Sequence, residues 1–251
     1  MMNRKLLPMM NVLNGGYIFT IFVFWLIPFM VLPSLTPMLG DGFWNNLNAL
    51  GWIDLAFCAI NGIGLILILK EHLGDSWFDV SVAPKDYIRP TLEAWILMML
   101  WVLASTLFGR FWAGTLTYMG NFFPVAEFSM NMVPILMLKD HPILSTLIFT
   151  MLTPFAVCGL FYAAGFAPLC SRKPILGYVG VIGVLVVCEM IRNFWYKQPG
   201  FAIQEFLFQL PVHLLACRAY QKTDNLWTPI FAIGLLNLTT SLLFFGLELL
   251  A

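Results

Sequence analysis

Long apolar runs constrain the fold of this chain more than any other sequence feature. A helix of about 20 apolar residues spans the hydrocarbon core of a bilayer. Runs of about this length lie near residues 16–35, 50–70, 92–112, 142–166, 174–196, 201–219 and 226–250. Because unpaired backbone groups are excluded from lipid, each run is predicted to be helical. We therefore expect an all-α fold, a polytopic bundle of about seven transmembrane helices.

Composition agrees with a membrane protein. The 251 residues are 60% hydrophobic and 10% charged, and mean hydropathy is +0.85, whereas soluble domains are about 25% charged. The formal net charge is zero and no basic tract occurs, so nothing favours nucleic acid as a partner. The longest hydrophilic piece, residues 71–90, is too short for a separate domain. We expect one membrane domain over residues 1–251, with the lipid bilayer as its partner.

The distribution of basic residues predicts the orientation. Seven spans with the N-terminus inside place nine Lys and Arg residues on the inner side and four on the outer side. This asymmetry follows the positive-inside rule and predicts a cytoplasmic N-terminus. The first run follows Arg4 and Lys5 without a small-residue cleavage site behind it, so we expect it to remain as an anchor. Segment 116–138, which is rich in Gly, Pro and Asn, is interpreted as a re-entrant or interfacial eighth segment.

Cysteine and histidine usage gives no metal or disulfide framework. The five cysteines lie in or beside apolar runs without paired spacing: Cys58, Cys158, Cys170, Cys188 and Cys217. They are predicted to be small hydrophobic residues inside the membrane. Of three histidines only His213 lies in a predicted span. We expect no metal and no cofactor.

Ionisable residues inside spans are costly and are therefore candidates for function. Glu189 and Arg192 are three residues apart and can neutralise each other on one helical turn. Glu205, Gln209 and His213 follow at intervals of four, so they share a helix face. That face is either a hydrogen-bonded seam between helices or the wall of a water-filled cavity, where Glu and His would serve acid–base chemistry.

The stretch KTDNLWTPIFAIGLLNL near the C-terminus resembles the last motif region of the CPBP family, the CAAX-prenyl-protease and bacteriocin-processing intramembrane proteases. In that family a T-G-N-L-W-x-P-I turn leads into a helix carrying H-x-x-x-N. Asn237 matches the Asn of this pattern, and Ile233 occupies the His position. The matching residues of the turn are Thr223, Asn225, Leu226, Trp227, Pro229 and Ile230.

A second stretch, TPFAVCGLFYA over residues 153–163, resembles the first family motif, T-P-x-A-E-E-x-x-F-R-G. Val157 and Cys158 replace the catalytic Glu pair, and Tyr162 replaces the Arg. A further family motif, F-x-x-x-H, would fall on Leu185 to Glu189, without its histidine. The resemblance covers residues 142–243 and implies a CPBP-like core whose helices at 142–166, 174–196 and 226–250 pack around a shared centre, with Val157, Glu189 and Asn237 facing it.

In the family the paired carboxylates are thought to activate water, which neither Val157 nor Cys158 can do as a glutamate would. The resemblance therefore favours a proteolytically inactive protein of the bacterial plasma membrane, which binds a membrane protein, a lipidated peptide or a lipid-like ligand. One alternative is an enzyme with a relocated site at Glu205, His213 and Asn237. Another is an unrelated transporter or membrane-complex assembly subunit. In the first reading Asn237 is an interhelical hydrogen-bond donor, because a buried amide needs a partner.

Overall fold

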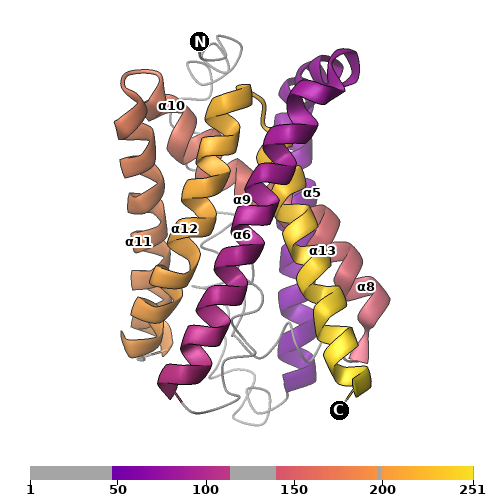
Figure 1. Cartoon of the computed structure of the whole chain (residues 1–251), viewed down its shortest axis with the longest axis vertical. Coiled ribbons are helices and arrows are strands. Elements are labelled where there is room, and N and C mark those ends of the chain that lie inside the picture. Colours follow the sequence, from indigo (N-terminus) through magenta and orange to yellow (C-terminus); the bar gives the residue numbers. More distant parts are fainter. Residues whose placement is uncertain (1–46, 114–139, 197–198, 251) are drawn as a thin grey trace.

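The computed structural model describes residues 47–113, 140–196 and 199–250, and within these ranges the chain is all-α (Figure 1). The predicted first span, 16–35, and the segment 116–138 lie outside the described residues. Six continuous helices make up the described ranges: α5 (Leu47–Val82), α6 (Pro84–Ala113), a composite helix over residues 142–170, α11 (Pro174–Tyr196), α12 (Pro199–Thr223) and α13 (Trp227–Leu250).

Proline sets where four of these helices begin. Pro84, Pro142, Pro174 and Pro199 are each the first residue of a helix. At that position the missing N–H costs nothing, because the first amides of a helix have no acceptor within it, and the fixed φ of proline already suits the helix. The predicted runs at 142–166, 174–196 and 201–219 correspond closely to helices that begin at one of these prolines. The run at 226–250 corresponds to α13, which begins at Trp227.

The composite helix contains two widened, π-helical turns. Its parts are α8 (Pro142–Leu147), η3 (Ile148–Leu152), α9 (Thr153–Cys158), η4 (Gly159–Phe166) and α10 (Ala167–Cys170). The N–H of Thr153 donates to the carbonyl of Ile148, five residues back, and Ala167 donates likewise to Tyr162. Pro154 and Pro168 follow directly. Because proline has no N–H and its ring clashes with the carbonyl four residues earlier, the helix widens before each one.

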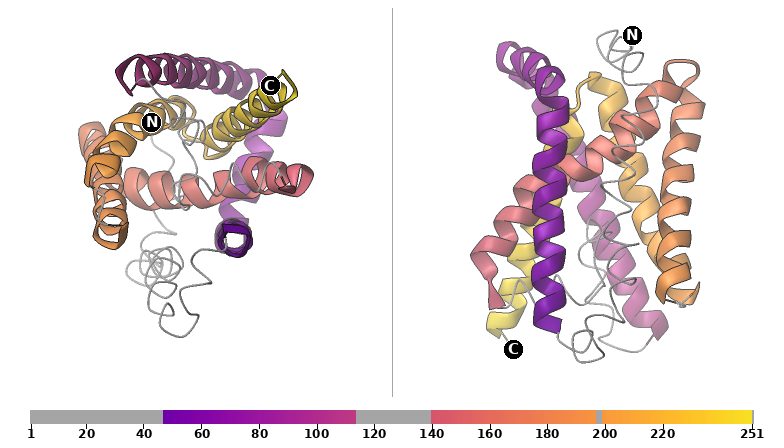
Figure 2. Two further views of the ribbon diagram at one scale, coloured as in Figure 1. Left: turned by 90° about the horizontal axis from the view of Figure 1, so that it is seen from below. Right: turned by 180° about the vertical axis from the view of Figure 1, so that it is seen from behind.

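The composite helix crosses the middle of the bundle (Figure 2). One part of it, η3 and α9, packs between α5 and α13, while η4 and α10 pack against α11. α6 lies outside, against α12 and α13. The core consists mainly of residues on the composite helix and of those facing it, including Leu65, Phe161, Val181 and Leu236.

Small residues let the helices approach closely. A Cβ added at Gly180 of α11 would lie 2.5 Å from the carbonyl oxygen of Gly165 in η4. One added at Gly62 of α5 would lie 2.5 Å from the carbonyl oxygen of Leu152. A Cβ added at Gly234 of α13 would lie 3.0 Å from the carbonyl oxygen of Thr150. Close backbone contact through small residues is typical of helix packing in membranes, where apolar burial gives no net attraction between helices.

The number of candidate spans is smaller than the sequence predicted. Within the described residues two helices are long and apolar enough to cross a membrane, Pro84–Ser105 and Pro142–Cys170. Pro174–Val187 and Trp227–Leu243 are apolar but shorter. These are length and composition criteria, and they support two spans rather than seven.

The hydrophilic residues 71–90 are almost entirely helical. α5 continues to Val82, and only Ala83 separates it from α6. The reason is that one face of this polar stretch is buried: His72, Leu73 and Ser76 are each 5% exposed or less. The average hydrophilicity of this stretch gives no sign that one face of the helix is packed.

Gly180→Ala should destabilise the protein by about 1–3 kcal/mol, because the added methyl group meets backbone and α11 must move away from η4. Gly183→Ala on the same helix is the matched control, since nothing lies within 4 Å of its added Cβ. That control should be neutral or stabilising by up to about 1 kcal/mol. Equilibrium unfolding in mixed micelles measures both, and equal stability of the two variants would contradict this packing.

Candidate functional site

The turn between α12 and α13 holds the residues that carried the family resemblance. Asp224 has a positive φ of 51°, and the backbone N–H of Trp227 donates to Oδ1 of Asn225 at 2.9 Å. Thr223 Oγ1 donates to Oγ1 of Thr228 at 2.9 Å. Asx turns and left-handed residues of this kind reverse the chain sharply. The motif therefore specifies a tight helix–helix turn.

The same turn fastens α13 to the distant end of α5. Nδ2 of Asn225 donates to the carbonyl of Ser76 at 2.8 Å, and Nε1 of Trp227 donates to the carbonyl of Leu73 at 2.9 Å. Trp77 packs edge-on against Trp227 with ring centroids 5.0 Å apart. Two motif residues thus act as structural donors across more than a hundred residues of sequence.

Asn237, the polar residue of the second half of the motif, is confirmed as an interhelical hydrogen-bond donor. Its Nδ2 donates to the carbonyl of Phe149 in η3 at 2.8 Å, and the side chain is buried. In this widened turn the N–H of Thr153 goes to Ile148, and the next residue, Pro154, has no N–H. Asn237 therefore supplies a donor to the Phe149 carbonyl at the turn where Pro154 cannot donate.

Three other family positions are packed. Val157 is 1% exposed, and Cys158 and Ile233 are 0% exposed. A side chain that lined a water-sized cavity would keep accessible surface, so no such cavity adjoins these three. Val157 and Cys158 lie on α9 and Ile233 on α13, which pack against each other.

The expected shared centre is only partly formed. α13 packs on η3 and α9, whereas α11 packs on η4, α10 and α12. The composite helix thus has α13 near one end and α11 near the other, because it crosses the bundle at a slant (Figure 2). The side chains of Glu189, Arg192 and Glu205 lie outside the described residues, so their predicted roles stay predictions.

His213 lies in a seam between helices. Its Nδ1 is 2.9 Å from the hydroxyl of Tyr162 in η4, and its ring stacks on Phe161 with centroids 4.0 Å apart. His213 and Gln209 are each 2% exposed. Of the two interpretations of this helix face, these contacts favour the seam. The sequence did not reveal the partner, although Tyr162 is the residue that stands at the family's Arg position.

Several buried polar atoms have no hydrogen-bond partner among the described residues. They are both amide atoms of Asn61, the hydroxyls of Thr146, Thr150 and Tyr220, and Oδ1 of Asn237. Asn61 lies next to Gly62, which packs closely against Leu152 of η3. The Asn61 amide on α5 is therefore near the widened turn η3. Buried groups of this kind usually hold ordered water. Asn61 was not predicted as a site residue, because it is a single amide in an otherwise apolar run.

The described residues contain no group of three or more His, Cys, Asp or Glu side chains that could hold a metal ion. Cys58, Cys158, Cys170 and Cys217 are free thiols.

No protein-family model, curated protein or solved structure matches this chain.

Asn237→Leu should destabilise the protein by about 1–2 kcal/mol, because the Phe149 carbonyl loses its donor inside the bundle. Thr240→Val is the matched control, since the Thr240 hydroxyl donates to carbonyls of its own helix, those of Leu236 and Asn237. We expect a change of a few tenths of a kcal/mol there. Unfolding in mixed micelles compares the two, and an equal loss would show that the Asn237 bond contributes nothing special.

Asp224 should make stability depend on pH. Burial raises its pKa to about 7 from an ordinary value of 3.8. Between these values the folded protein keeps a proton that the unfolded chain releases, so stability falls as pH rises from about 4 to about 7 and is level above that. Asp224→Asn should remove this component, and Asn also tolerates positive φ. Melting temperatures at several pH values test it.

Asp86→Asn is the control for that measurement, because Asp86 is an exposed carboxylate on α6. It should leave the pH dependence as in the original protein. If the melting temperature of Asp224→Asn depends on pH as that of the original protein does, the Asp224 carboxyl is not the source of the pH dependence.

Proposed function

We propose that the chain is an integral membrane protein with a CPBP-like core that acts by binding a partner, not by proteolysis. The observation that carries the proposal is the burial of the family's catalytic positions. Val157, Cys158 and Ile233 have at most 1% of their surface exposed and offer no acid–base group of the required kind. Asn237, the matched polar residue, is engaged in a structural bond to Phe149.

The turn geometry supports the resemblance. The family pattern has glycine where this chain has Asp224, and Asp224 adopts a φ of 51°. Glycine is the residue that adopts such a conformation without steric cost. A pattern that places glycine there therefore fits the backbone of this turn.

The outer surface supports a place in the membrane. Large apolar side chains are exposed along α5, α6, α8, α11 and α13, among them Leu67, Leu100, Ile143, Val179 and Leu242. In water an apolar surface of this extent would drive association, whereas in lipid it is the expected exterior. A cytoplasmic N-terminus and a bacterial plasma membrane, both predicted from the sequence, remain part of the proposal.

A cleavage assay tests the lack of proteolysis. Purified protein in lipid vesicles is incubated with a panel of membrane peptides that includes prenylated ones. We expect no cleavage, and none from Ile233→His, because the water-activating carboxylates would still be absent at Val157 and Cys158. Cleavage by the original protein that Glu205→Gln abolishes would overturn the proposal in favour of a relocated catalytic site.

A further inference from the structure

A groove of about 540 Å³ runs along the outer face of α6. Its lining combines apolar and charged residues: Lys85, Ile88, Arg89, Leu92, Glu93, Ile96 and Leu97. Ile88, Leu92 and Ile96 are exposed and recur every fourth residue, so they form one stripe along the helix. Eight residues of helix extend about 12 Å, which fits within one leaflet of a bilayer about 30 Å thick.

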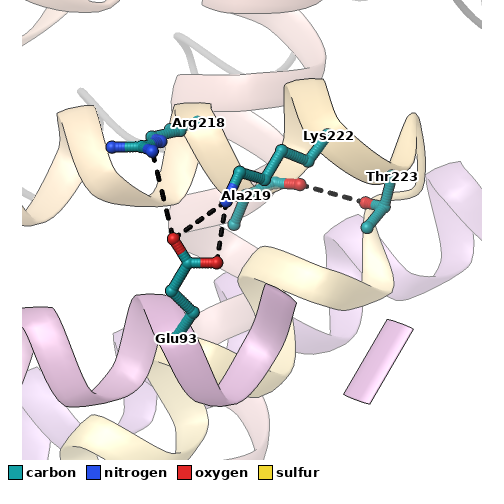
Figure 3. A network of polar contacts seen from close by, with 5 residues as sticks. All are labelled: Glu93, Arg218, Ala219, Lys222 and Thr223. Atoms are coloured by element: carbon teal, nitrogen blue, oxygen red, sulfur yellow. Dashed lines mark hydrogen bonds and ion pairs between the residues drawn. The ribbon is translucent and has the colours of Figure 1, made fainter. Parts of the chain in front are cut away.

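Basic residues gather beside this apolar stripe. The carboxylate of Glu93 accepts two hydrogen bonds from Nζ of Lys222, at 2.7 and 2.9 Å, and lies 4.0 Å from Nη2 of Arg218 (Figure 3). Lys85 and Arg89 precede Glu93 on α6, two turns and one turn away, and are exposed. With Asp86, which lies between Lys85 and Arg89, the four cations and two carboxylates leave two positive charges in excess.

The Glu93–Lys222 bond ties α6 to α12 and fixes this arrangement. Because Lys222 already neutralises Glu93, the positive charge of the groove lining belongs to Lys85 and Arg89. Arg218 and Asp86 do not line the groove, and their charges are opposite. An exposed cluster of this sign beside an apolar stripe matches the two ends of a phospholipid, a phosphate and a hydrocarbon chain.

We propose that the groove binds an anionic phospholipid, whose phosphate contacts Lys85 and Arg89 and one of whose acyl chains lies along Ile88, Leu92 and Ile96. A free phosphate would make no use of the apolar stripe. A zwitterionic headgroup would bring a quaternary ammonium into a positive cluster. The inference rests on the proposed membrane location, and it gives the binding role a ligand class.

Competition between lipids tests the inference. The full chain, purified in mild detergent, is mixed with equal amounts of phosphatidylglycerol and phosphatidylcholine carrying the same acyl chains, and native mass spectrometry measures the ratio bound. A basic residue at the membrane surface contributes on the order of fivefold in affinity for anionic lipid. We expect a preference of about tenfold or more for phosphatidylglycerol, and a loss of most of it in Lys85→Gln/Arg89→Gln.

Arg172→Gln/Lys173→Gln is the matched control. These two residues are exposed in the turn between α10 and α11, at the same end of the bundle as the groove's charges (Figure 1). The control should keep the preference, and Leu92→Ser should weaken retention of phosphatidylglycerol without unfolding the protein, because Leu92 is exposed. Inorganic phosphate alone should not raise the melting temperature as the lipid does.

Three results would each overturn the inference: equal binding of the two lipids, an equal loss of preference in the control pair, or full stabilisation by phosphate alone. Extraction of cell membranes with alkaline carbonate separates this failure from that of the proposed function. A chain released by carbonate contradicts the membrane location itself. A chain that stays in the membrane but shows no lipid preference contradicts the groove alone.

Discussion

The rest of the structure depends on how one helix, residues 142–170, manages the hydrogen bonds that its prolines remove. Pro154 and Pro168 each follow a widened turn, and the freed carbonyls need other donors, because backbone groups are not left unpaired in a dry interior. Asn237 supplies one such donor to Phe149. The glycines at 62 and 234 bring α5 and α13 up to the same turn, so the irregular helix organises its neighbours.

This architecture gives the residues of a catalytic pattern a structural use. Thr223, Asn225 and Trp227 shape and fasten a turn, and Tyr162 bonds His213 where the family has an arginine. The residues that shape this turn and pack the helices are needed for the fold, whether or not other residues activate a water molecule for proteolysis. Under the proposed resemblance, the motif keeps its structural residues while its acid–base residues are replaced.

Sequence reasoning identified elements better than contacts. Apolar length predicted the helices at 142–166 and 174–196, and the need of a buried amide for a partner predicted a donor role for Asn237. The extension of α5 to Val82 was missed, because polarity averaged over the stretch hides a buried face. The Tyr162 partner of His213, 51 residues away, and the buried Asn61 depend on how helices cross, which periodicity within one helix does not encode.

α5 has 36 residues, which at 1.5 Å per residue gives a rod about 54 Å long, well beyond the roughly 30 Å of a hydrocarbon core. Tilt alone shortens such a rod too little, so in a bilayer one end must project into the aqueous phase. The Asn225 and Trp227 bonds hold it at Ser76 and Leu73, near the end joined to α6 through Ala83 alone. Under the proposed membrane location, a change of bilayer thickness that tilts α5 would therefore also move the start of α6.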